Sequence, residues 1–124
     1  MKKVVFIFSF LVFSLGFASS VEDAIEDSLI LKYPSISDGK TSIKVHEYDV
    51  DIDHHKIELK IEVKGDETKE KFEKLDQDKL EIYFTQMIKY IQKESKKSLP
   101  VELEVELDRD FHPDIDLYKN TFIY

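Results

Sequence analysis

The chain has 124 residues, contains no cysteine, and carries 26 acidic against 18 basic residues, which gives a formal net charge of −8 at pH 7. This length holds one small domain, and the acidic balance argues against binding to nucleic acid or to anionic lipid, since both need a basic surface. The absence of cysteine excludes disulfides, thiolate catalysis, cysteine-ligated zinc and lipoprotein acylation.

Residues 1–20 have the pattern of a signal peptide. Two lysines follow the initial methionine, residues 4–15 are apolar apart from two serines, and small residues allow cleavage after Ala18 or Ser20. The apolar stretch is shorter than the roughly 20 residues of a membrane-spanning helix, so we expect cleavage and no integral membrane span afterwards. Removal of the two lysines takes the net charge from −8 to −10. We therefore expect a secreted or extracytoplasmic protein, in the periplasm or cell-wall space of a bacterium, with residues 21–124 as one domain.

The expected domain begins with a helix. Ser19 and Ser20 fit a capping position, and apolar residues recur at helical spacing over about residues 21–32, until Tyr33-Pro34 ends the pattern. Residues 35–40 are predicted to form a loop.

A period of two then predicts strands. The apolar positions change parity between Val45 and Tyr48, which requires either a bulge near His46-Glu47 or two separate short strands. After a turn at residues 53–56, residues 57–63 alternate apolar and charged side chains and give the clearest strand of the chain.

The second half predicts one long helix and one more strand. Residues 67–94 carry an apolar stripe at helical spacing, although Asp76-Gln77-Asp78 could interrupt its first turns because Asp is a poor interior helix residue. Residues 101–107 again alternate, and the aromatic tail to Tyr124 is predicted to add an edge strand or to dock on the sheet.

These elements predict the α+β class, with the order α-β-β-α-β. Because each clear strand has only one apolar face, we expect a small two-layer sandwich in which two helices cover one face of the sheet. The sheet is predicted to have three strands, or four if the tail joins it.

Acidic side chains on the outer faces of the strands are the main candidates for binding. They are Asp49, Asp51 and Asp53 before the first turn, and Glu102, Glu104, Glu106 and Asp108 on the last clear strand, where successive carboxylates lie about 7 Å apart. The strand order decides their surroundings. Beside residues 57–63, Lys60 and Lys64 would offset the charge of the last strand. Beside Asp49, Asp51 and Asp53, the acids of both strands would instead form a strongly negative surface.

A second candidate surface is the flank of the long helix that carries Tyr83 and Tyr90, at i and i+7. Together these features predict a small acidic binding or assembly module without enzymatic activity. We expect it to act through protein–protein contact, with a basic partner or by self-association, and we expect no cofactor.

Two alternatives remain open. His46, Asp53, His54 and His55 could ligate a divalent metal or help to bind a small ligand at the hairpin, although the spacing Asp49-x-Asp51-x-Asp53 departs from an EF-hand loop, which would need Gly at His54 and Glu at Lys60. A carboxylate-based hydrolase is less favoured, because exposed carboxylates lack the buried surroundings that separate the pKa values of a catalytic pair.

Overall fold

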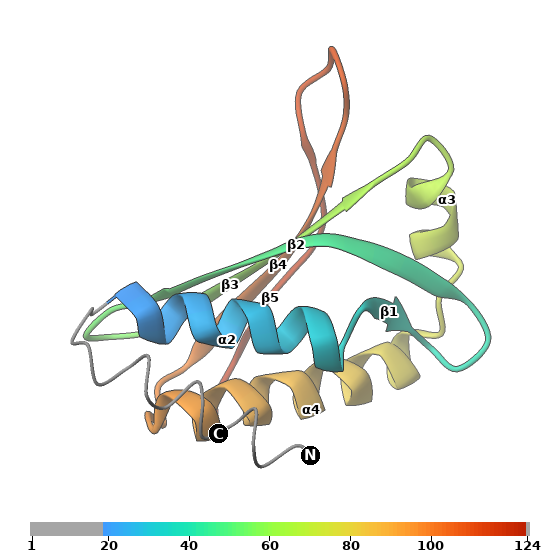
Figure 1. Cartoon of the computed structure of the whole chain (residues 1–124). Helices are drawn as coiled ribbons and strands as arrows, with labels where there is room; N and C mark the ends of the chain where they lie inside the picture. The colour runs from blue at the N-terminus through green and yellow to red at the C-terminus, as the bar shows by residue number, and fades with distance from the viewer. Residues whose placement is uncertain (1–18, 124) are drawn as a thin grey trace.

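The computed structural model describes residues 19–123, so the predicted signal peptide lies outside the described residues apart from Ser19 and Ser20 (Figure 1). The elements in chain order are α2 (Ser19–Lys32), β1 (Ser35–Ser37), β2 (Ser42–Ile52), β3 (Ile57–Lys64), α3 (Thr68–Glu73), α4 (Gln77–Ser95), β4 (Val101–Asp108) and β5 (Ile115–Phe122).

The five strands form one mixed sheet in the order β1-β2-β3-β4-β5. All neighbours are antiparallel except β3 and β4, which run parallel because α3 and α4 connect them. The sheet curves into a half-barrel, with α2 and α4 against its concave side (Figure 1).

The predicted sheet of three or four strands under two helices is therefore wrong. Among the described residues, the structure has five strands and three helices. One extra strand is β1, which was predicted as loop because it has three residues and only one apolar side chain, Ile36. It pairs with the start of β2 around a turn held by Asp38, whose Oδ1 accepts hydrogen bonds from the backbone N–H groups of Lys40 and Thr41 at 2.9 and 2.8 Å.

The other addition is β5, where the tail forms a full strand of eight residues beside β4. Its alternation is hidden in the sequence because the register shifts: Val105 pairs with Tyr118 but Glu106 pairs with Asp116, so Leu117 is an extra residue. The predicted long helix is two helices. Asp76 caps α4 by accepting hydrogen bonds from the N–H groups of Asp78 and Lys79, which confirms the expected interruption there.

The apolar side chains of the sheet face α2 and α4. Every second residue of β3 and of β4 is buried, and these residues pack with the α4 stripe of Leu80, Phe84, Met87, Ile88 and Ile91. The charged residues that alternate with them lie on the opposite, convex face. One side of the sheet thus provides the core, and the other is left for charge.

Helix α2 covers the part of the β2 edge that β1 does not pair with. Carboxylate oxygens of Glu26 and Glu22 accept hydrogen bonds from the N–H groups of Val50 and Ile52, both at 2.7 Å. These side chains occupy backbone donors that would otherwise be free to pair with another strand.

Candidate functional site

The convex face of the sheet is predominantly acidic. No helix among residues 19–123 covers it (Figure 1). We call it the acidic face and define it by the carboxylates of Glu47, Asp49, Asp51, Glu58, Glu62, Glu102, Glu104, Glu106, Asp108 and Asp116.

Strand register aligns these carboxylates in rows across the sheet. One row runs Asp51, Glu58, Glu102, and a second runs Glu47, Glu62, Glu106, Asp116, each residue being the cross-strand partner of the next. Between them lies a mixed row in which Lys60 and Lys119 alternate with Asp49 and Glu104. Because like charges directly opposite each other destabilise a sheet, the two acidic rows cost stability.

Lysines offset only part of this charge. Strand β4 lies beside β3, which is one of the two arrangements considered from the sequence, so Lys60 and Lys64 face the carboxylates of β4. The Lys60 nitrogen lies 4.0 Å from a carboxylate oxygen of Glu106, and the Lys64 nitrogen lies 3.5 Å from one of Asp108. Lys56 lies 3.7 Å from Glu102. These are partly exposed pairs, each worth at most about 1 kcal/mol.

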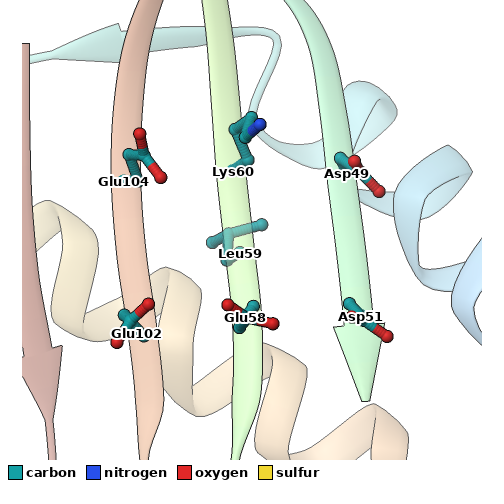
Figure 2. Close-up of a pocket in the computed structure, with 7 residues that line it drawn as sticks. All are labelled: Asp49, Asp51, Glu58, Leu59, Lys60, Glu102 and Glu104. Atoms are coloured by element: carbon teal, nitrogen blue, oxygen red, sulfur yellow. The ribbon is translucent and has the colours of Figure 1, made fainter. Parts of the chain in front are cut away.

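Figure 2 shows the part of this face where three strands meet in a depression of about 180 Å³. Asp49 and Asp51 come from β2, Glu58, Leu59 and Lys60 from β3, and Glu102 and Glu104 from β4. Four of the predicted acidic residues therefore share one hollow, with Lys60 as the only cationic side chain among the lining residues. A carboxylate-lined hollow of this kind suits an ammonium or guanidinium group.

Partial burial and neighbouring carboxylates raise pKa values in the second acidic row and at Glu104 in the mixed row. A hydrogen bond with Asp116, together with partial burial, raises the pKa of Glu104. Partial burial raises the pKa of Glu106, against the opposing effect of Lys60. Partial burial and then the charges of Asp108 and Glu47 raise the pKa of Glu62. The face holds its negative charge at an energetic cost.

The β2 bulge brings an imidazole to this face. The register shifts between Val45 and Glu47, which leaves His46 as the extra residue and confirms the predicted bulge. His46 and Glu47 are both exposed, and their ligand atoms lie within 4.8 Å of those of Glu62. A carboxylate-only cluster of Glu104, Glu106 and Asp116 meets the same distance limit.

The remaining predicted metal ligands lie elsewhere. Asp53 is in the β2–β3 turn, where its Oδ1 accepts hydrogen bonds from the N–H groups of His55 and Lys56 at 2.7 and 2.8 Å, and these bonds lower its pKa. His54 and His55 are exposed in the same turn. Across the described chain, the clusters able to hold a metal include none of these three residues, so the structure does not bring the predicted set together.

Tyr83 and Tyr90 lie on the helical side of the molecule, away from the acidic face. Tyr83 donates a hydrogen bond to the carbonyl oxygen of Ser35, and both rings pack edge-on against Tyr33, with centroids 5.7 and 6.1 Å away. The ammonium of Lys32 lies 4.5 Å from the Tyr90 ring centroid. The two tyrosines therefore join α4 to α2 and β1, and both are half-buried.

The hairpin between β4 and β5 projects beyond the rest of the sheet (Figure 1). Phe111 in its loop is fully exposed, at 102% of the reference area, and has a positive φ of 65°. Asp110 and His112 beside it help to line a second depression of about 330 Å³, at the end of β3. Both side chains are exposed.

None of the helices in residues 19–123 combines the length and apolar composition needed to cross a membrane. No protein-family model, curated protein or solved structure matches the chain.

Several members of the acidic face were not predicted from the sequence. Asp49, Asp51 and the β4 carboxylates were predicted binding residues, whereas Glu58 and Glu62 were expected only to point outward, and Glu47 and Asp116 were not among the candidates. The regular alternation of β3 would have been enough to predict Glu58 and Glu62 as members. Glu47 and Asp116 lie next to bulges, where the alternation fails.

Proposed function

We propose that the protein is a non-enzymatic binding module that acts outside the cytoplasm and docks a basic protein partner on the acidic face. The observation that carries this proposal is the pair of carboxylate rows on a sheet face that no described helix covers. Such a surface attracts lysine- and arginine-rich segments and increases their association rate.

The energetic cost of the rows supports a binding role. Solubility alone requires only dispersed surface charge, whereas here Glu62 faces Glu47 on one side and Glu106 on the other. A basic partner would neutralise these carboxylates and relieve their repulsion. The same charges that destabilise the free protein would then stabilise the complex.

The β4–β5 hairpin supplies an exposed apolar side chain at the end of the sheet where β4 finishes with Asp108 of the acidic face. Phe111 is exposed next to Asp110, and a positive φ at a non-glycine residue costs roughly 1 kcal/mol or more. Large aromatic side chains are typical anchors of protein interfaces. We therefore place Phe111 in the interface, where it enters an apolar recess bordered by basic residues.

Quantitative affinity capture from the extracytoplasmic fraction, with three matched baits, tests this function. The first is the wild type, and the second is neutralised on the acidic face by Glu58→Gln, Glu102→Gln and Glu106→Gln. The third has the same net charge but is changed on the helices, by Asp27→Asn, Glu70→Gln and Glu81→Gln, at positions that are all exposed.

The proposal predicts a partner that the wild type and the helix variant retain equally and the face variant loses. Retention should fall steeply with salt, because the screening length shortens from about 10 Å at 0.1 M to about 3 Å at 1 M. Equal retention by the two variants, or a partner insensitive to salt, would contradict the proposal.

A further inference from the structure

A mixed imidazole–carboxylate cluster lies at the β2 bulge, separate from the depression in Figure 2. His46 and Glu47 come from β2 and Glu62 from β3, and Glu47 and Glu62 are direct cross-strand partners. All three side chains reach the convex face because the extra residue lets two consecutive β2 side chains point outward.

We infer that His46, Glu47 and Glu62 form a binding site for a divalent transition-metal ion of the Zn²⁺ type. The site shares Glu47 and Glu62 with the acidic face, but the inference does not rest on the docking function. Carboxylates alone favour hard cations such as Ca²⁺ and Mg²⁺, whereas an imidazole nitrogen with two carboxylate oxygens suits zinc and its neighbours. For this reason the neighbouring cluster of Glu104, Glu106 and Asp116, which offers oxygen only, carries no such assignment.

The ligand atoms of the three side chains lie close to the spacing that a bound zinc ion requires. Ligand atoms bonded to tetrahedral zinc at about 2.0 to 2.1 Å lie about 3.3 Å apart. The three groups lie within 4.8 Å of one another, so side-chain rotations that move the ligand atoms by roughly 1 to 2 Å close the site. The remaining coordination position is open to water.

The surroundings favour a cation and leave the ligands available. Asp108 and Asp114 place further negative charge near Glu62. Within residues 19–123, no hydrogen bond or ion pair engages the side chains of His46, Glu47 or Glu62. A metal would relieve the repulsion between the two glutamates and would take the place of the attraction between His46 and Glu62.

Titration calorimetry of the metal-free full protein with ZnCl₂ tests the inference, with imidazole ¹H–¹⁵N spectra to identify the ligand. We expect one Zn²⁺ per chain, a rise in melting temperature, and a shift of the His46 ring resonances alone among the four histidines. His46→Ala and Glu62→Gln should each weaken the binding at least about tenfold, since even changes outside the ligand shell commonly cost 10- to 100-fold.

Two matched controls localise the site. The double variant His54→Ala, His55→Ala removes two imidazole groups, whereas His46→Ala removes one. Asp116→Asn removes a carboxylate from the neighbouring cluster. Both controls should bind Zn²⁺ like the wild type. Far-ultraviolet circular dichroism verifies that every variant is folded. Absence of binding at millimolar Zn²⁺, or loss of binding in the His54/His55 variant with retention in His46→Ala, would overturn the inference. Because the probe is the metal alone, and capture of the partner is run with a chelator, failure of one proposal leaves the other standing.

Discussion

Asp116→Asn should stabilise the protein, because it relieves the most crowded carboxylates of the acidic face. Asp116 is the cross-strand partner of Glu106 and forms a hydrogen bond with Glu104 that two ionised carboxylates cannot share. Asparagine has the same shape, and its amide N–H can donate to the Glu104 carboxylate without a shared proton. The substitution therefore keeps the contact and removes the repulsion.

The magnitude follows from the two relieved interactions. The like-charged cross-strand pair of Asp116 and Glu106 costs about 0.2 to 1 kcal/mol, and the contact of Asp116 with Glu104 adds a similar amount. We therefore expect a gain of about 1 kcal/mol in the free energy of unfolding at pH 7. For a domain of this size that corresponds to a rise of roughly 4 to 8 °C in melting temperature. Urea denaturation at pH 7, with Asp27→Asn on α2 as the control, measures the difference. The control should lie within about 0.5 kcal/mol of the wild type.

The pH dependence identifies the cause. The folded protein raises the pKa of Glu104, so at acidic pH the native state of the wild type binds a proton more readily than the unfolded chain. The stability associated with this group is full below its unfolded pKa and is lost as the pH rises through the raised value. The advantage of Asp116→Asn should therefore shrink to nothing near pH 4. An advantage that persists at pH 4, or a loss of stability at pH 7, would refute the reasoning.

Three further predictions concern the fold. Tyr48→Phe should lower the free energy of unfolding by about 1 to 3 kcal/mol in urea titrations, because the buried Tyr48 hydroxyl donates to the carbonyl oxygen of Tyr33 at 2.6 Å; an unchanged midpoint would contradict the importance of this bond. Gly65→Ala should cost about 1 to 3 kcal/mol, since its φ is 115° and an added Cβ would lie 2.9 Å from a side-chain oxygen. Gly39→Ala, at φ 94° with open space around it, is the matched control and should cost less in the same assay. Backbone hydrogen bonds hold the pKa of Asp38 at about 2, below its ordinary value of 3.8. The stability that the ionised Asp38 provides is present above pH 3.8 and should be lost as the pH falls toward 2. Asp38→Asn should therefore abolish this acid-dependent fall in melting temperature.

The elements with a strong period were predictable from sequence. Helix α2, strands β3 and β4 and the α4 stripe follow from regular apolar spacing, and the parity change between Val45 and Tyr48 correctly indicated a bulge. The two missed features have local causes. In β1 a single apolar residue cannot define a period, and in β5 the extra Leu117 interrupts it.

The site was predictable only in part, because its properties depend on strand order and register. The sequence indicated which carboxylates point outward on β2 and β4, but not that β3 lies between these strands and aligns Glu58 and Glu62 with them. His46 was recognised as a metal-ligand candidate but was grouped with the turn histidines. Glu62 lies 16 residues away along the chain and comes close to His46 only through the bulged register of β2 and β3.

The most direct test of the central claim is to map where a basic ligand binds. Backbone ¹H–¹⁵N spectra of the protein, titrated with a decalysine peptide in the presence of a chelator, report contact residue by residue. We predict shifts concentrated in β2, β3, β4 and β5 at the residues of the acidic face, with loss of these shifts in the face-neutralised variant. Shifts spread equally over the exposed acids of α2 and α4, or unchanged in that variant, would show that the acidic face is not a binding surface.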